Sequence, residues 1–452
     1  MSILDPKPPT RAELTATYAQ QWKPATAYAA GQPVVNPSGD VVTAKAAFTS
    51  GATYDAANWN TAPGIAAKLD KTEAAASYAP KASPAFTGVP TVNGQQIAPA
   101  ATPYPYWRKK VAQVRAGLSD AKLLCLGDST TFGYVAPPND VATPPIASYP
   151  SDLAAILNNY FAPAFVGLGI PKAQSGSSKD GRWTVGSGWT YTPGSAIGWG
   201  NSEMYFGTAS SGGLVYTPGT SAGTVDTFDV YYVHSSSAPF TIQATGGAPV
   251  TVTPTGSAGV YKATCTAGSA ATTNSVTITT GTGTERITGV EAYHSSIRRI
   301  RVGNAGVGGS TSKTWGAASN SFNSIPHITA YAPDLTIIDL GINDFASPNT
   351  PAATFKANIT AIVNAAKLSG DVILMVPPPP DISGNLAAGY AELIPTYPDL
   401  ATTLQTGLVD ITSRWVSRNN LNPLGYYSDT LHPSRIGYGD MAQAVSTLIR
   451  AI

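Results

Sequence analysis

The chain has 452 residues and 43% hydrophobic content, enough for about three domains with packed cores. Only 12% of the residues are charged, against a usual figure of about 25%, and Gly, Ser, Thr, Ala and Pro fill the deficit. This composition is typical of β-rich extracellular or virion surfaces. The net charge of +1 and the lack of a basic cluster argue against nucleic acid as a partner. No apolar run approaches the roughly 18 residues of a membrane span.

Targeting signals, cysteines and histidines narrow the possibilities further. No signal peptide is expected, because no apolar stretch of the needed length follows the first seven residues. The two cysteines, Cys125 and Cys265, lie far apart in the sequence, which favours free buried thiols over a disulfide. The four histidines show no metal-ligand spacing, so we expect neither a metal nor a cofactor.

Residues 1–62 predict a small β-rich module. Alternating segments at 32–35 and 40–43 lie between turn residues, and Trp22 and Trp59 flank them. The pattern is similar to small β modules of phage tail proteins and of some chitinase-type carbohydrate-binding domains. Its aromatic rings either form the core or stack on sugar, and the small size of the module favours the core.

Residues 63–101 read as a short stalk. The segment carries apolar and small residues at a four-three spacing that fits a weak coiled coil, namely Ile65, Leu69, Thr72, Ala76 and Ala79. Residues 81–94 then resemble the "ASPxFTGxPTV" repeat of phage tail fibres, in which three chains wind together. The resemblance implies a homotrimer. The alternative is a Pro/Ala linker without a fixed partner.

Residues 102–175 and 299–452 predict one α/β domain with a parallel sheet. Strand-like apolar runs occur at 123–126, 335–340 and 372–376. They alternate with helical patterns at 149–160, 352–367 and from 435 to the end, which makes a parallel sheet the economical arrangement.

Between these two parts lies a long insertion, residues 176–298, with almost no helical pattern. Short β runs separated by Gly, Ser, Pro and Thr predict an inserted β-sandwich of about 120 residues. Trp183, Trp189 and Trp199 near its start either form a glycan platform beside a cleft of the α/β domain or pack in the core. The sequence does not separate the two roles.

The tripeptide Gly-Asp-Ser at 127–129 follows the apolar run at 123–126 and precedes turn-like residues. Ser129 therefore lies just past the carboxyl end of a buried strand, where open α/β sheets bind their ligands. A serine hydroxyl is a weak nucleophile until a base removes its proton. We predict His432 as that base, with Asp429 three residues earlier to orient the imidazole.

Attack on an ester creates an oxyanion that pre-oriented donors stabilise. The backbone N–H groups of Ser129 and Gly306 and the side-chain amide of Asn343 are the predicted donors. Gly306 belongs to Asn-Ala-Gly at 304–306, and Asn343 to Gly-Ile-Asn-Asp at 341–344 after an apolar run. Each short motif alone could be an ordinary turn, but their joint occurrence in order at strand ends favours a catalytic serine.

A rival nucleophile is Ser221, in Gly-Thr-Ser-Ala-Gly at 219–223, which matches the Gly-x-Ser-x-Gly elbow of α/β-hydrolases. That elbow needs a helix after the serine. A strand-like run at 225–233 follows instead, so the interpretation of a hairpin turn is favoured.

The four motifs together resemble the SGNH (GDSL) hydrolase family, whose blocks are a GDS serine, a glycine, a GxND asparagine and a DxxH pair. Ser129, Gly306, Asn343, Asp429 and His432 occupy the matching positions. The resemblance covers residues 104–175 and 300–452 and implies a three-layer flavodoxin-like fold. It implies no particular substrate, because the family includes lipases, acetyl-sugar esterases and thioesterases.

The combined hypothesis is a serine esterase on a trimeric phage tail fibre or spike, located in the virion. It would remove O-acetyl or similar acyl groups from a host surface polysaccharide, and its N-terminal module would contact other tail proteins. One alternative is a secreted, extracellular bacterial carbohydrate or lipid esterase. Another is a receptor-binding protein that keeps the esterase fold as an adhesion platform.

Overall fold

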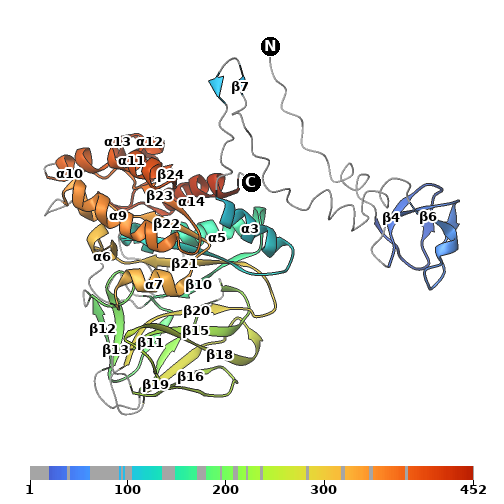
Figure 1. Cartoon of the computed structure of the whole chain (residues 1–452), viewed down its shortest axis with the longest axis horizontal. Coiled ribbons are helices and arrows are strands. Elements are labelled where there is room, and N and C mark those ends of the chain that lie inside the picture. The colour runs from blue at the N-terminus through green and yellow to red at the C-terminus, as the bar shows by residue number, and fades with distance from the viewer. Residues whose placement is uncertain are drawn as a thin grey trace. The chain divides into compact units, whose positions relative to one another are not determined.

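A computed structural model of the chain describes residues 20–37, 41–61, 91–92, 95–96, 104–134, 148–170, 180–193, 196–206, 212–219, 222–234, 238–280, 285–316, 321–345, 350–381 and 385–450. The chain divides into two compact units, Met1–Ala100 and Ala101–Ile452 (Figure 1). The predicted stalk lies outside the described residues except for a short hairpin of β7 (Thr91–Val92) and β8 (Gln95–Gln96).

The first unit contains a small β module. Its elements are β1 (Gln20–Gln21), β2 (Ala27–Tyr28), β3 (Pro33–Val35), β4 (Val41–Ala44), β5 (Phe48–Thr49), the 3-10 helix η1 (Ala56–Asn58) and β6 (Trp59–Thr61). The strands pair in the order β1-β3-β4-β6, and β2 pairs with β5. Tyr28 and Trp59 are 3% and 5% exposed, with ring centroids 5.1 Å apart. These two rings pack in the core of the module, as favoured from the sequence over stacking on sugar.

The second unit is built on a central sheet whose middle strands are parallel. These strands are β9 (Ala121–Gly127), β10 (Ala164–Gly169), β21 (Ile300–Gly306), β22 (Leu335–Asp339), β23 (Asp371–Val376) and β24 (Gly407–Asp410). They pair in the order β10-β21-β9-β22-β23-β24. The predicted strands at 335–340 and 372–376 are confirmed to within one residue at each end.

Helices cover both faces of this sheet. They are α3 (Pro105–Arg115), α4 (Ser129–Phe132), α5 (Tyr149–Tyr160), α6 (Ser312–Gly316), α7 (Ser324–Tyr331), α8 (Ile342–Phe345), α9 (Ala352–Ala366), α10 (Asn385–Leu393), α11 (Thr396–Thr403), α12 (Ile411–Trp415), α13 (Arg418–Leu421), the 3-10 helix η5 (Asn422–Leu424) and α14 (Arg435–Arg450). The Ser148 side chain caps α5 by accepting from the Ser151 N–H at 3.3 Å. The predicted helices at 149–160, at 352–367 and from 435 onward are confirmed.

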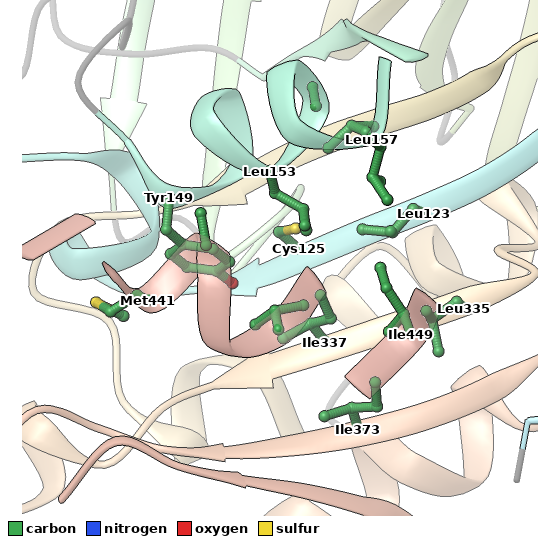
Figure 2. Packing of buried hydrophobic residues seen from close by; sticks show 14 of the residues in the cluster. Leu123, Cys125, Tyr149, Leu153, Leu157, Leu335, Ile337, Ile373, Met441 and Ile449 are labelled. Atoms are coloured by element: carbon green, nitrogen blue, oxygen red, sulfur yellow. The ribbon is translucent and has the colours of Figure 1, made fainter. Parts of the chain in front are cut away.

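The two faces of the sheet bury different side chains because residues alternate along a strand. On β9, Leu123 and Cys125 point to the face covered by α3, α5 and α14. Leu124 and Leu126 point to the opposite face, which α7, α9 and α11 cover. Figure 2 shows the first of these layers, where Leu123 and Cys125 pack beside side chains of α5 and α14. A strand buried on both faces reads as a continuous apolar run, which explains the pattern at 123–126.

The insertion is all-β, and it extends the central sheet. Its strands are β11 (Trp183–Val185), β12 (Trp189–Pro193), β13 (Ser202–Phe206), β14 (Leu214–Tyr216), β15 (Val225–His234), β16 (Phe240–Ala244), β17 (Val250–Val252), β18 (Gly259–Ala271), β19 (Val276–Thr280) and β20 (Glu285–Tyr293). β20 pairs antiparallel with β10, so the central sheet is mixed and continues as β12-β13-β20-β10. Strands β15 and β18 join it through β20.

A second sheet in the insertion has the order β11-β14-β19-β16-β17. Side chains of both sheets, such as Ile242 and Ile278 on one and Phe228 and Val290 on the other, form a shared apolar core. Figure 1 shows this region in green and yellow. It differs from an independent sandwich because one of its sheets is continuous with the sheet that carries Ser129. Residues 101–452 accordingly form one compact unit.

The three tryptophans at the start of the insertion are buried. Trp183, Trp189 and Trp199 are 2%, 6% and 0% exposed. The indole N–H groups of Trp183 and Trp189 donate to backbone carbonyls at 3.1 Å. Core packing is therefore their role, and the alternative of a glycan platform is wrong for these side chains. Trp199 belongs to the hydrophobic cluster beneath α7 and α9, outside the core of the insertion itself.

Both cysteines are buried free thiols, as expected. None of the helices in the described ranges is long and apolar enough to cross a membrane.

Glu285, at the start of β20, gives a test of this packing. Its side chain is 1% exposed, and neither carboxyl oxygen has a hydrogen-bond partner among the described residues. Burial raises the pKa of Glu285 to about 8. Because the folded pKa exceeds that of the unfolded chain, the stabilisation from the neutral carboxyl is complete below about pH 4 and is lost as the pH rises through about 8.

We therefore expect Glu285→Gln to match the wild type in free energy of unfolding at pH 4. At pH 9 the variant should be more stable by roughly 2–5 kcal/mol, because the glutamine does not ionise. Chemical denaturation at the two pH values measures the difference. A pH-independent gap between the two proteins would contradict the burial of an ionisable Glu285.

Candidate active site

Ser129 lies at a sharp strand-to-helix turn. β9 ends at Gly127, Asp128 caps the short helix α4, and Ser129 is the first residue of that helix. The Asp128 carboxylate accepts from the Thr130 N–H at 2.8 Å, which fixes the turn. Ser129 is 8% exposed. The capped turn holds the Ser129 hydroxyl at the carboxyl end of a central strand, as predicted from the sequence.

Gly127 is packed too closely for any side chain. A Cβ at this position would lie 2.1 Å from Thr131 Oγ1 and 2.4 Å from the Asp339 carbonyl oxygen. The Gly127 carbonyl accepts from the Val307 N–H at 3.0 Å and from Ser310 Oγ at 3.2 Å. These contacts join the ends of β9, β21 and β22 around the serine.

His432 and Asp429 come from the loop before α14 and meet Ser129 in space. His432 Nε2 lies 3.0 Å from Ser129 Oγ, and His432 Nδ1 lies 2.8 Å from Asp429 Oδ2. The other carboxylate oxygen, Oδ1, accepts from the backbone N–H groups of Leu431 and His432 at 2.7 and 2.6 Å. The structure thus brings the three predicted catalytic residues together as a hydrogen-bonded Ser-His-Asp triad.

The charge state of Asp429 follows from these bonds. Partial burial would raise its pKa, but hydrogen bonds from the backbone and imidazole of His432 and from the Leu431 N–H outweigh burial and hold the pKa below its usual range. Asp429 is therefore a carboxylate at neutral pH. An anion at Nδ1 keeps a proton on that nitrogen and leaves Nε2 free to accept the proton of Ser129.

Tyr134 is a neighbour of the site that sequence patterns do not single out. Its ring centroid lies 4.3 Å from that of His432. The hydroxyl of Tyr438, on α14, donates to the Tyr134 carbonyl at 2.7 Å. Tyr134 thus packs against one face of the imidazole, and no motif or spacing in the sequence could have identified it.

Asn343, one of the predicted oxyanion donors, has its side chain oriented by a hydrogen bond to a neighbouring turn. It lies in α8, directly after β22, and its Nδ2 donates to the Ser310 carbonyl at 2.9 Å. A primary amide carries two N–H groups, so this bond orients the second one. The adjacent Asp344 accepts from the N–H and hydroxyl of Ser312 at 2.8 and 2.7 Å, which ties α8 to the start of α6.

The N–H of Gly306 is already hydrogen-bonded within the fold. It is the last residue of β21 and is buried, and its N–H donates to Asn304 Oδ1 at 3.0 Å. A Cβ there would lie 2.1 Å from the backbone nitrogen of Phe132, so the glycine is required for packing against α4. The prediction of Gly306 as a donor is therefore wrong, because its N–H is already bonded within the fold.

The turn that follows β21 holds better donors. The N–H groups of Val307 and Ser310 are used by the carbonyls of Gly127 and Val307. Within the described part of the chain, the N–H groups of Gly308 and Gly309 have no hydrogen-bond acceptor. A Cβ at Gly308 would lie 3.9 Å from that of Ser129, so the turn contacts the nucleophile. The sequence shows Gly308 and Gly309 as well as Gly306, but only the structure shows which of their N–H groups are already hydrogen-bonded.

The rival Ser221 lies outside the described residues. No group of three or more His, Cys, Asp or Glu side chains suited to a metal ion occurs in the ranges that the structure covers. The chemistry of the site is that of a hydroxyl, an imidazole and a carboxylate joined by hydrogen bonds, a set that performs acyl transfer through a serine ester.

Comparison with known proteins agrees with this geometry. Residues 274–439 match the model of the GDSL-like Lipase/Acylhydrolase family. This range includes Asn343, Asp429 and His432 but begins well after Ser129, which the structure brings to the same site. No curated protein matches the chain.

Solved structures with a similar fold include one described as "Peptidoglycan O-acetylesterase in action, 5 min". It is 17% identical, with 77% of this chain and 97% of that chain covered and a TM-score of 0.59. A lipase/acylhydrolase from Enterococcus faecalis is 21% identical over 34% of this chain and 76% of its own, with a TM-score of 0.28. An acetyl xylan esterase is 18% identical over 34% of this chain and 82% of its own, with a TM-score of 0.27.

The first likeness supports the fold, an α/β hydrolase domain of the SGNH type with a mixed central sheet. The family match and the line of bonds from Ser129 to Asp429 support the chemistry. The chain contains a GDSL/SGNH hydrolase domain, and the protein is a carboxylic ester hydrolase.

Proposed function

We propose that this esterase removes O-acetyl or other short acyl groups from a host cell-surface polysaccharide. The observation that carries the proposal is the hydrogen-bonded line of Ser129, His432 and Asp429 at the carboxyl end of the central sheet. The likeness in fold to a structure named as a peptidoglycan O-acetylesterase supports an acetylated glycan as substrate.

The reaction begins when Ser129 Oγ attacks the ester carbonyl carbon. His432 Nε2 lies 3.0 Å away and accepts the hydroxyl proton, and the imidazolium that forms is stabilised by the Asp429 carboxylate at Nδ1. The carbonyl π electrons move to oxygen and create an oxyanion. When this tetrahedral intermediate collapses, the C–O bond to the alcohol breaks and His432 gives its proton to the departing oxygen.

The oxyanion needs donors placed in advance. The side-chain N–H of Asn343 that is not bonded to Ser310 is one, and the backbone N–H of Ser129 is another. We assign the third to the turn at Gly308–Gly309 in place of Gly306. All three directly follow the ends of neighbouring strands, β9, β21 and β22.

The second half of the reaction repeats the first with water as nucleophile. His432 removes a proton from water, and the resulting oxygen attacks the acyl carbon of the Ser129 ester. The intermediate collapses, the bond to Ser129 Oγ breaks, and His432 returns its proton to that oxygen. The products are the carboxylic acid and the original enzyme.

Ser129→Ala should abolish hydrolysis of acetyl esters. Loss of the nucleophile typically lowers kcat by about 10⁴- to 10⁶-fold. Acetate release from an O-acetylated polysaccharide and from 4-nitrophenyl acetate measures the effect, with butyryl and longer nitrophenyl esters to report acyl length. Ser257→Ala, a change at an exposed hydroxyl, is the matched control and should retain full activity. A wild-type protein that prefers long acyl chains would contradict the proposed short-acyl specificity.

Asp429→Asn tests the orienting role of the carboxylate. The amide can no longer accept the Nδ1 proton as an anion does, so the imidazole loses the tautomer and the charge stabilisation it needs. We expect kcat to fall by about 10² to 10⁴-fold with little change in KM. Because the bonds to Asp429 lower its pKa, wild-type activity should not fall through protonation of this carboxylate until the pH is below about 4. A variant with near wild-type kcat would sink the assignment.

The proposed setting is a phage tail fibre or spike, in which the N-terminal module contacts other tail proteins. Its support is the sequence of residues 81–94, which resembles a trimeric tail-fibre repeat, and the four-three spacing from Ile65 to Ala79. A fibre-bound esterase would act on the polysaccharide at the surface of the host cell.

The full chain should therefore behave in solution as a trimer, with three times the 46.5 kDa mass of one chain. The double variant I65D/L69D should become monomeric, because charged side chains cannot pack in a coiled-coil core. Light scattering coupled to size exclusion measures both masses. A monomeric wild type would favour a linker at 63–101.

A further inference from the structure

A cavity of about 190 Å³ lies beside the catalytic serine, between the insertion and the hydrolase sheet. One wall is formed by Tyr191 of β12 and by residues 200–202, where β13 begins, and the other is the turn that follows β21. Its described lining residues are Tyr191, Gly200, Asn201, Ser202, Val307, Gly308, Gly309, Ser310 and Thr314.

The cavity is within reach of the reacting atoms. Gly308 lines it and also lies beside Ser129, since an added Cβ there would be 3.9 Å from Ser129 Cβ. Ser310, another lining residue, accepts from the Asn343 amide at 2.9 Å. A ligand whose ester carbonyl lies at Ser129 can therefore extend into this space.

The segment that leads into the insertion wall, residues 196–201, has an unusual and tightly fixed backbone. Ala196, Gly198, Gly200 and Asn201 have φ angles of +57°, +85°, +55° and +60°. This left-handed region is costly for residues other than glycine, although asparagine tolerates it better than most. Such a conformation persists only where the surrounding structure holds it in place.

Three contacts hold the segment against the hydrolase domain. The Gly198 N–H donates to the Phe322 carbonyl at 2.8 Å, and the Gly200 N–H donates to Ser324 Oγ at 3.0 Å. The Trp199 ring, between them, is fully buried, with its centroid 5.4 Å from that of His327. The position of Asn201 at the rim of the cavity is therefore fixed by the fold.

Asn201 differs from the other polar side chains of the cavity in having no hydrogen-bond partner among the described residues. Tyr191 Oη and Ser202 Oγ are 3.1 Å apart, Ser310 Oγ donates to the Gly127 carbonyl, and Thr314 Oγ1 lies 3.1 Å from Thr311 Oγ1. The half-buried amide of Asn201 makes no hydrogen bond to a described residue. It offers two donors and one acceptor to a ligand.

We propose that this cavity binds the alcohol part of the ester, a sugar that carries hydroxyl or amide groups, and that Asn201 is its recognition residue. The inference rests on the proposed function and deepens it. The lining carries the polar side chains of Tyr191, Asn201, Ser202, Ser310 and Thr314, and a sugar hydroxyl can both donate to and accept from the Asn201 amide. An alcohol without such groups would gain nothing from Asn201.

The test compares two acetyl esters that differ only in the alcohol, 6-O-acetylglucose and 4-nitrophenyl acetate. The variant is Asn201→Gly, because glycine keeps the left-handed backbone and removes only the side chain. Ala196→Gly is the matched control, since it makes the same backbone change at φ +57° without removing a hydrogen-bonding group. Melting temperatures of both variants report on folding.

We expect Asn201→Gly to lower kcat/KM for 6-O-acetylglucose by about 5- to 30-fold, with nitrophenyl acetate changed by less than about twofold. The control variant should behave as the wild type on both esters. Equal losses on the two esters, or no loss on either, would overturn the subsite while leaving the esterase intact. A changed preference between acetyl and butyryl nitrophenyl esters would also overturn it, because the cavity would then hold the acyl group. A wild type that cleaves none of these esters would overturn the proposed function, and this subsite with it.

Discussion

The close approach of three strand ends at Gly127 is the constraint on which the active site depends. The Gly127 carbonyl accepts from the turn after β21, and Thr131 Oγ1 donates to the Asp339 carboxylate at the end of β22 at 3.0 Å. These bonds fix the nucleophile and its oxyanion donors relative to one another. The loop with His432 and Asp429 reaches the site from outside this cluster, from the segment before α14.

This arrangement places carboxyl groups where water cannot reach them. Asp128 and Asp339 are both about 1% exposed, and burial raises the pKa of both, to about 7 for Asp339. The nearby Asp339 raises the pKa of Asp128 further. Each accepts one hydrogen bond from a threonine of α4, which compensates part of the cost of burial. The remainder must come from the apolar layers on the two faces of the sheet. The polar turn that holds Ser129 is therefore stable only within a well-packed domain.

Local patterns could be predicted from the sequence, and distant pairings could not. Ser129 follows an apolar strand directly, and Asp429 lies three residues before His432, so both features appear within one short window. The prediction of Gly306 as an oxyanion donor is wrong because sequence spacing does not reveal whether a backbone N–H is already bonded to a nearby side chain, here that of Asn304. The pairing of β20 with β10 joins Glu291 to Leu168, far apart in the sequence, and no periodicity indicates such a contact.

The pairing of β20 with β10 makes the insertion an integral part of the hydrolase domain rather than a separate domain. Its strand β20 covers the edge of β10, and Trp199 fills space in the hydrolase core between α7 and the sheet. A Cβ at Gly200 would lie 2.7 Å from Val307 Cγ2 and 2.9 Å from Trp315 Cζ2, so the segment also packs against the turn that contacts Ser129. Removing the insertion would expose a strand edge and empty a tryptophan-sized space. The insertion and the turn that follows β21 must therefore fold together. A substitution in either one changes the packing surface of the other.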